Sequence, residues 1–200
     1  MFTVLRRSVV SQQQANRDIP SVTLGGSLRA ALFACFVATP AFADELDEFS
    51  TPPTPTETTT DCADGLIYDD ATKACVAPED ASDDQAALYL DARELAWAGR
   101  FDDATRVLAQ MEKTDKTLTY QGFVARKSGD WASAENFYLA ALEANPNNLL
   151  ARSYYGQGLA DAGFLEAAKN QLSEIRQRGG RQTWPEVALR LHLDGADSGY

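Results

Sequence analysis

Three six-residue stretches of the sequence align with one another: GRFDDA at 99–104, GDWASA at 129–134 and AGFLEA at 162–167. In each stretch an aromatic residue precedes an alanine by three positions, and the stretch lies between two segments with apolar residues at helical spacing. The alanines stand at 104, 134 and 167, so the spacings are 30 and 33 residues. Periods of this size are typical of arrays of paired helices, in which each unit buries its apolar face against its neighbour.

Helical periodicity around these stretches predicts an all-α repeat domain at 82–195, with about three helix pairs and a capping helix at 184–193. Ser82 begins a capping-box pattern at the first helix, and Thr183 begins another at the last. Asp130 is placed to cap the second helix of the middle pair. We expect the last residues, 196–200, to be a disordered tail.

The middle unit resembles the tetratricopeptide repeat. Its small, aromatic and proline residues match the signature positions of that family: Gly122, Ala125, Gly129, Trp131, Ala134, Tyr138, Ala141 and Pro146. In the third unit Phe164 and Ala167 match, whereas Gly156 and Gly163 lie one residue off the pattern. The resemblance implies a tetratricopeptide-like α-solenoid.

Packing between repeats is expected to use the aromatic and the small residue of each aligned stretch. The alanines would let helices approach, and the aromatics would fill the space between units. These residues are Phe101, Ala104, Trp131, Ala134, Phe164 and Ala167.

A concave groove lined by the first helix of each pair is implied by the same resemblance. By register, the predicted partner-binding residues are Tyr89, Arg93, Tyr120, Phe123, Arg126, Lys127, Arg152 and Tyr155. Aromatic anchors beside arginines suit the apolar and carboxylate groups of a peptide. The alternative is that the aromatics are inter-helix core and the arginines are solvated.

The N-terminal residues 1–43 have the features of a secretory signal peptide. A short apolar run at 30–39 is followed by an Ala-x-Ala motif ending at Ala43, where we expect cleavage. The run is shorter than the roughly 20 apolar residues that span a bilayer, so no stable membrane insertion is expected after cleavage. The long region before it suggests that translation begins later, at Val22. The prediction is a bacterial protein that is periplasmic or secreted.

The negative charge of the chain is concentrated in one segment. Residues 44–85 contain thirteen acids and one lysine, whereas 86–200 contain fifteen acids and thirteen bases. Such a balance argues against nucleic acid or an anionic membrane as a partner, because both require basic patches. We interpret the acidic, Thr/Pro-rich residues 44–61 as an extended linker. Two further hypotheses are that the segment docks a basic partner, or that it folds back onto the groove arginines.

Cys62 and Cys75 remain as an even pair once the signal is removed. In an oxidising compartment such a pair forms a disulfide, so we predict a stapled hairpin and short linker at 62–81. The hairpin is similar to the C-terminal piece of cysteine-rich carbohydrate-binding modules, which implies polysaccharide contact through Tyr68. Two cysteines and the lone His192 are too few for a metal site.

Enzyme chemistry has no recognisable sequence pattern in this chain. We find no Gly-rich phosphate loop and no Gly-x-Ser-x-Gly motif, and His192 has no nucleophile at a suggestive spacing. The sequence therefore predicts a monomeric, cofactor-free, non-enzymatic scaffold or adaptor of the cell envelope that binds a protein or peptide partner. The alternative is an envelope glycan-binding adaptor that uses the Cys62–Cys75 hairpin.

Overall fold

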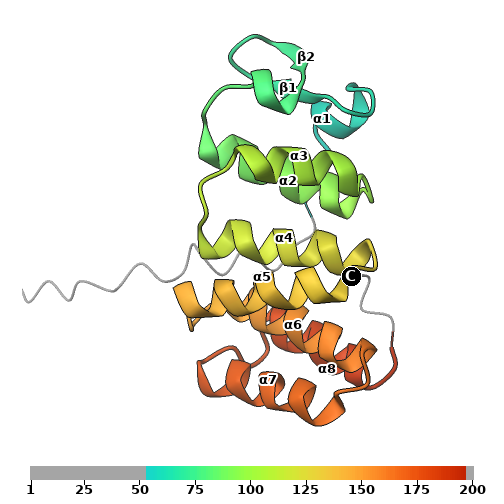
Figure 1. Cartoon of the computed structure of the whole chain (residues 1–200), viewed down its shortest axis with the longest axis vertical. Helices are drawn as coiled ribbons and strands as arrows, with labels where there is room; N and C mark the ends of the chain where they lie inside the picture. Colours follow the sequence, from blue (N-terminus) through green and yellow to red (C-terminus); the bar gives the residue numbers. More distant parts are fainter. Residues whose placement is uncertain (1–52, 197–200) are drawn as a thin grey trace, which may run out of the picture. The chain divides into compact units, whose positions relative to one another are not determined.

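The computed structural model describes residues 53–196 (Figure 1). All described residues belong to one compact unit. The predicted signal peptide, most of the predicted linker and residues 197–200 of the predicted tail lie outside the described range. Within that range the protein is predominantly helical, with eight α-helices, one 3-10 helix and one two-stranded sheet.

Three helix pairs and a terminal helix form most of the described unit, as the periodicity predicts. The pairs are α2 (Gln85–Trp97) with α3 (Phe101–Gln110), α4 (Asp115–Lys127) with α5 (Trp131–Ala144), and α6 (Leu149–Asp161) with α7 (Leu165–Gln177). The terminal helix α8 (Trp184–Leu193) packs against both α6 and α7. The first helices of successive pairs also touch, because α2 contacts α4 and α4 contacts α6. Figure 1 shows the pairs following one another from α2 to α7.

The same turn ends the first helix of each pair. A glycine follows the helix with positive φ, +77° at Gly99 and +86° at Gly129 and Gly163. The next amide donates to the carbonyl five residues earlier at 2.8–2.9 Å, which is the Schellman arrangement. Because side-chain-bearing residues avoid this conformation, these glycines determine where each pair reverses direction.

The helix N-termini differ from the predicted capping boxes. Asp84, rather than Ser82, caps α2 by accepting two backbone amides at 3.0 and 3.2 Å. Thr183 makes no cap, because its hydroxyl donates to the carbonyl of Gly180 at 2.7 Å. The predicted Asp130 cap is confirmed, since its carboxylate accepts a first-turn amide of α5 at 3.1 Å.

Burial of the alanines corrects the register of the third unit. Ala104, Ala134 and Ala168 are each 0% exposed. Ala167 is only half-buried, so the buried alanine of the third unit lies one residue after the predicted one. Phe164 is 59% exposed and Leu165 is 51% exposed, so the predicted packing role of Phe164 is wrong. The spacing from Ala134 to Ala168 is 34 residues, the usual tetratricopeptide period.

Two glycines at close approaches between helices share this 34-residue spacing. A Cβ on Gly122 would lie 2.5 Å from the ring of Tyr138, and one on Gly156 would lie 2.6 Å from Leu189. Both distances are below any real carbon contact. Gly122 therefore brings α4 against α5, and Gly156 brings α6 against α8.

A disulfide-linked hairpin packs at the start of the helical pairs. Strand β1 (Ile67–Asp69) pairs antiparallel with β2 (Ala74–Val76), and the predicted Cys62–Cys75 disulfide is confirmed. The short helix α1 (Glu57–Thr60) contacts α2 and β1, and the 3-10 helix η1 (Pro78–Asp80) contacts α3. Ile67 is 1% exposed and joins the same apolar core as α2 to α6.

The Thr/Pro-rich segment is not a simple extended linker where the structure describes it. The hydroxyl of Thr58 donates to Asp91 of α2 at 2.7 Å, and the hydroxyl and amide of Thr56 donate to Glu94 at 2.7 and 2.8 Å. Thr59 also donates to Glu94. The linker prediction for 44–61 is therefore wrong at residues 56–60, because these hydroxyls find carboxylate acceptors on α2.

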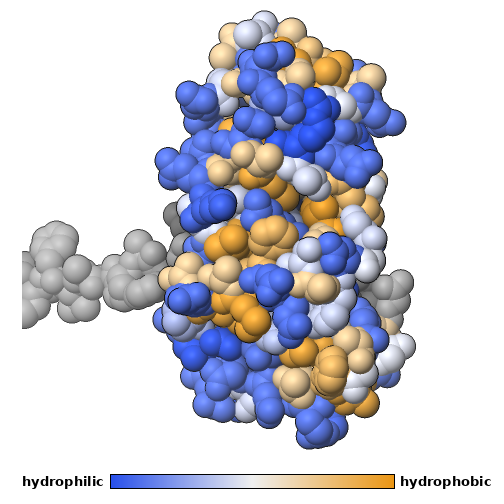
Figure 2. Space-filling model, in the orientation of Figure 1, coloured by the Kyte–Doolittle hydropathy of each residue, from blue (hydrophilic) through white to orange (hydrophobic). Residues whose placement is uncertain are grey.

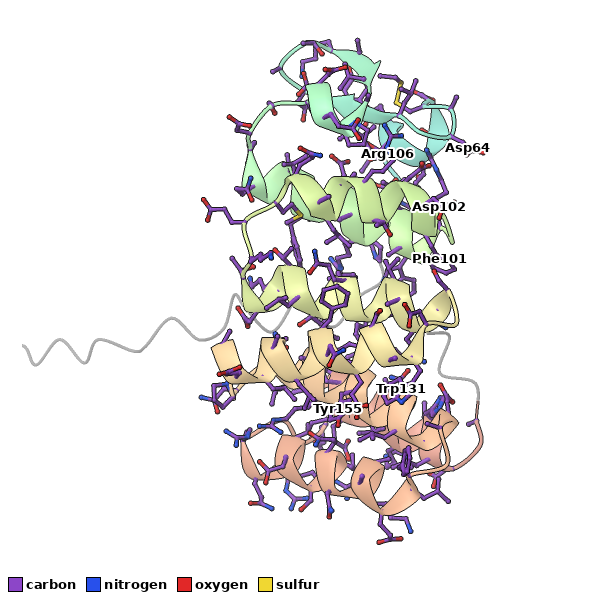
Figure 3. The ribbon with its side chains drawn as sticks, in the orientation of Figure 1. Asp64, Phe101, Asp102, Arg106, Trp131 and Tyr155 are labelled. Carbon is purple, nitrogen blue, oxygen red and sulfur yellow. A yellow bond between two sulfur atoms is a disulfide. The ribbon has the colours of Figure 1, made fainter. Side chains whose placement is uncertain are left out.

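Two arginines of the first pair hold the hairpin by its backbone. Arg100 donates to the carbonyls of Thr58, Ala63 and Leu66 at 3.0–3.2 Å. Arg106 donates to the carbonyl of Gly65 at 2.9 Å and pairs with Glu79 through two further bonds. Figure 3 shows Arg106 extending from α3 toward the hairpin.

Candidate functional site

The aromatic residues assigned to the groove belong to the core. Tyr89, Tyr120 and Phe123 are 8%, 1% and 3% exposed. Their rings form a chain, with centroids 5.6 Å apart for Tyr89–Tyr120 and 4.9 Å for Phe123–Tyr154. The chain links α2, α4 and α6, so the inter-helix alternative is the correct one for these three side chains.

Tyr155 and Lys127 also make contacts within the fold. Tyr155, labelled with Trp131 in Figure 3, stacks on the Trp131 ring with centroids 6.1 Å apart and nearly parallel planes. Its hydroxyl donates to Glu135 at 3.1 Å. Burial, together with this bond, raises the pKa of Tyr155 to about 12. Lys127 lies over the Phe123 ring at 5.7 Å. Tyr155 is half-buried and supports the packing of α5 and α6, whereas Lys127 is exposed and lies over its own helix α4.

The predicted groove arginines are engaged by other helices rather than solvated. Arg126 donates to Asp161 at 3.2 Å and to Gln157 at 3.1 Å. Arg152 is 8% exposed and donates to the carbonyl of Pro146 at 2.8 Å and to Gln171 at 3.0 Å. Both guanidinium groups therefore already have acceptors within the fold.

Arg93 is buried as well, with 7% of its surface exposed, and it interacts with the hydroxyl of Tyr120. Acids of the segment before α2 pair elsewhere: Asp64 lies 3.5 Å from Arg100, and Glu79 lies 2.8 Å from Arg106. Both arginines are outside the predicted groove set. Two of the described acids therefore pair with arginines outside the predicted groove, whereas the acids at 44–48 lie outside the described residues.

His192 contacts a carboxylate at the other end of the described unit. Its Nε2 lies 2.7 Å from Asp161, which also accepts from Arg126. Among residues 53–196, no three histidine, cysteine or acidic side chains come together in a way that could hold a metal ion.

A pocket of about 490 Å³ opens between the N-terminal halves of α2 and α4. Its apolar lining includes Tyr89, Met111 and Leu90, which is 53% exposed. Lys116 lies at the rim, 5.9 Å from the centre of the Tyr89 ring. We call this the α2–α4 pocket. Its size falls in the range of pockets that take one or two side chains or a small ligand.

A second cavity of about 560 Å³ lies between the hairpin, α1 and α2. We call it the acidic cleft. Its apolar lining includes Ile67, Leu88 and Leu90, and Tyr68 lies half-buried at its wall. The acids in its lining are Glu57, Asp69, Asp70, Asp84 and Asp91. No lysine or arginine is part of this lining in the portion of the chain that the structure describes.

Two carboxylates of the acidic cleft have opposite pKa shifts. Hydrogen bonds, chiefly from the Thr72 side chain, lower the pKa of Asp69 to about 2. Burial raises the pKa of Asp91 to about 6; the Thr58 hydroxyl opposes this shift, and the nearby carboxylate of Glu94 adds to it. Asp69 is thus firmly ionised, whereas Asp91 is a desolvated anion at neutral pH.

Leu90 borders both cavities, so the α2–α4 pocket and the acidic cleft meet at one exposed apolar side chain. Sequence reasoning missed both sites. The available signal was that Leu90 lies off the helical face formed by Leu88, Ala92 and Leu95. On the face drawn in Figure 2, apolar residues form several patches separated by polar side chains rather than one continuous area.

The chain matches no family model, no curated protein and no solved structure in the comparisons with known proteins. No helix within residues 53–196 has the length and apolar character needed to cross a membrane.

Proposed function

We propose that this protein is a tetratricopeptide-like α-solenoid that acts as a non-enzymatic adaptor in the bacterial cell envelope. The proposal is supported by three packed helix pairs and by the 34-residue spacing of the buried alanines Ala134 and Ala168. The disulfide favours an oxidising, extracytoplasmic compartment. A protein or peptide partner would bind at the α2–α4 pocket.

The observation that carries the proposal is the exposure of Leu90 at the rim of an apolar pocket. A leucine that is 53% exposed beside Tyr89 and Met111 offers a partner apolar surface at no unfolding cost. The partner side chain would enter the pocket, and Lys116 at its rim would favour a carboxylate or carbonyl group of the bound segment.

Site-specific photocrosslinking tests this assignment. A photoreactive phenylalanine analogue replaces Ala86, an exposed residue in the pocket lining, in the full chain expressed in its native cells. The matched control carries the same analogue at Lys169, an exposed position on α7. A protein adduct formed from Ala86 and absent from Lys169 supports the proposal. Equal adducts, or none at Ala86, contradict it.

The glycan-binding alternative has one supporting observation, the half-buried Tyr68 beside carboxylates in the acidic cleft. Aromatic rings and carboxylates are groups that can contact a sugar. A pull-down on envelope polysaccharide, with Tyr68→Ala as the variant, separates the two functions. Retention of wild type together with loss of the variant would favour the glycan adaptor.

A further inference from the structure

The acidic cleft is a preformed site rather than a chance cluster of acids. Its walls come from α1, β1 and α2, and they are joined by the Thr58–Asp91 bond and by the contacts of Glu94 with Thr56. The disulfide and the Arg100 bonds fix the hairpin that completes it. The shape of the cleft is therefore set before any ligand arrives, which lowers the entropic cost of binding.

No lysine or arginine from the described part of the chain lines the acidic cleft. Asp70 pairs with Lys73 at the exposed outer edge, at 2.7 Å. Within residues 53–196, the Thr58 hydroxyl is the one donor to the Asp91 side chain, and two other carboxylates, Asp69 and Asp70, lie close enough to raise its pKa. Ionised Asp91 thus costs stability in the free protein, and a cation in the cleft would offset that cost.

The apolar part of the lining indicates what carries the cation. The apolar surface comes from Ile67, Leu88 and Leu90. A hydrated metal ion makes no favourable contact with such surface, and the cavity is larger than one ion would fill. A lysine or arginine side chain combines an apolar stem with a charged end and so matches both parts of the lining. The N-terminal part of this chain does not supply such a side chain. Its arginines at 1–43 belong to the predicted signal, and the segment just before α1 carries the acids Asp44, Glu45, Asp47 and Glu48. Charge complementarity therefore points to another protein.

We propose that the acidic cleft binds a segment of a partner protein in which a lysine or arginine stands beside an apolar residue. The cation reaches Asp91 and Asp70, and the neighbouring apolar side chain packs on Leu90, where the cleft meets the α2–α4 pocket. This inference rests on the proposed adaptor function and names the chemistry of its partner.

Peptide binding to the full chain tests the inference. The probes are three fluorescent twelve-residue peptides: alternating leucine and lysine, alternating leucine and glutamate, and alternating serine and lysine. Fluorescence anisotropy gives their dissociation constants at 50 and 300 mM salt. The leucine–lysine peptide should bind at least about tenfold more tightly than either other peptide, and raising the salt should weaken it about threefold.

Charge-neutralising variants locate the binding. Asp91→Asn/Asp70→Asn should weaken the leucine–lysine peptide about fivefold, as the loss of two partly exposed ion pairs implies. The matched control, Asp102→Asn/Glu143→Gln, makes the same change in net charge at two exposed residues outside the cleft and should change affinity less than twofold. Removing the Asp91 charge is expected to raise thermal stability, so lost affinity could not be ascribed to unfolding.

The outcomes separate this inference from the function it rests on. Equal affinity for the lysine and glutamate peptides, equal effects of both double variants, no binding of the leucine–lysine peptide, or a Tyr68-dependent glycan as the sole ligand would each overturn the inference. The Ala86 crosslink would still report on the adaptor function in all of these cases. Loss of the Ala86 adduct with a retained charge-selective peptide would instead reject the α2–α4 pocket as the acceptor.

Discussion

Replacing Asp91 with asparagine should stabilise the protein at neutral pH. Burial is the main reason that the pKa of Asp91 is raised from 3.8 to about 6, so the folded protein binds the Asp91 proton more tightly than the unfolded chain does. Above pH 6 both states are ionised and the folded state carries the full desolvation cost. As the pH falls from 6 toward 3.8 the folded protein takes up the proton, and this cost disappears.

The magnitude follows from the shift. Each pKa unit corresponds to about 1.4 kcal/mol, which for this shift sets an upper limit of about 3 kcal/mol. Asp91 is only half-buried, so solvent screening reduces the effect to the order of 1 kcal/mol. Asparagine keeps an oxygen that can accept the Thr58 hydroxyl, so the docking of α1 is retained. The melting temperature of Asp91→Asn should rise by roughly 2–6 °C at pH 7.5.

Thermal denaturation followed by circular dichroism at several values between pH 4 and pH 8 checks this. The gain should shrink as the pH falls through 6 and should be absent near pH 4, where wild-type Asp91 is protonated. Glu143→Gln, an exposed acid on α5, should shift stability by less than about 0.5 kcal/mol at every pH. A variant no more stable than wild type at pH 7.5, or a gain independent of pH, would refute the desolvation argument.

Three further changes test the hairpin and the register. Arg100→Gln should destabilise the protein by about 2–4 kcal/mol, because the carbonyls of Thr58, Ala63 and Leu66 lose a charged donor. It should also expose α1 and the hairpin to hydrogen exchange before the helix pairs, whereas Arg181→Gln on the exposed surface should do neither. Reducing the Cys62–Cys75 disulfide should cost about 3 kcal/mol in urea denaturation, since it closes a loop with a sequence separation of 13; an unchanged midpoint would argue against its stabilising role. Ala168→Leu should lower stability by about 1–3 kcal/mol while Ala167→Leu has little effect, and the reverse order would restore the register predicted from the sequence.

Helix boundaries could be predicted from the sequence because they depend on local chemistry. The Gly99 and Gly129 turns and the Asp130 cap involve atoms within a few residues of one another. The buried alanine of the third helix pair could not be predicted from the stretch at 162–167, because burial of Ala168 depends on packing by other helices. The 34-residue spacing of Gly122 and Gly156 was the available signal for it.

The site was harder to predict because its contacts are non-local. Arg126 binds Asp161, which is 35 residues away in the sequence. Helical periodicity alone cannot distinguish an arginine with such an internal partner from an exposed arginine that is available to a ligand. The acidic cleft depends on the bond between Thr58 and Asp91, 33 residues apart. The sequence of a threonine-rich segment indicates a spacer. Its docking is recognisable only when the structure shows the α2 carboxylates that accept hydrogen bonds from its hydroxyls.

Those threonine hydroxyls also make the segment sensitive to covalent chemistry. Thr58 is 1% exposed and gives its only hydroxyl proton to Asp91. A phosphate or sugar on that oxygen would remove the proton, add bulk where no space exists, and, for a phosphate, bring negative charge against two carboxylates of α2. Helix α1 therefore cannot dock on α2 when Thr58 is modified. If modification precedes folding, the acidic cleft lacks the wall that α1 provides; if folding comes first, Thr58 is buried and protected.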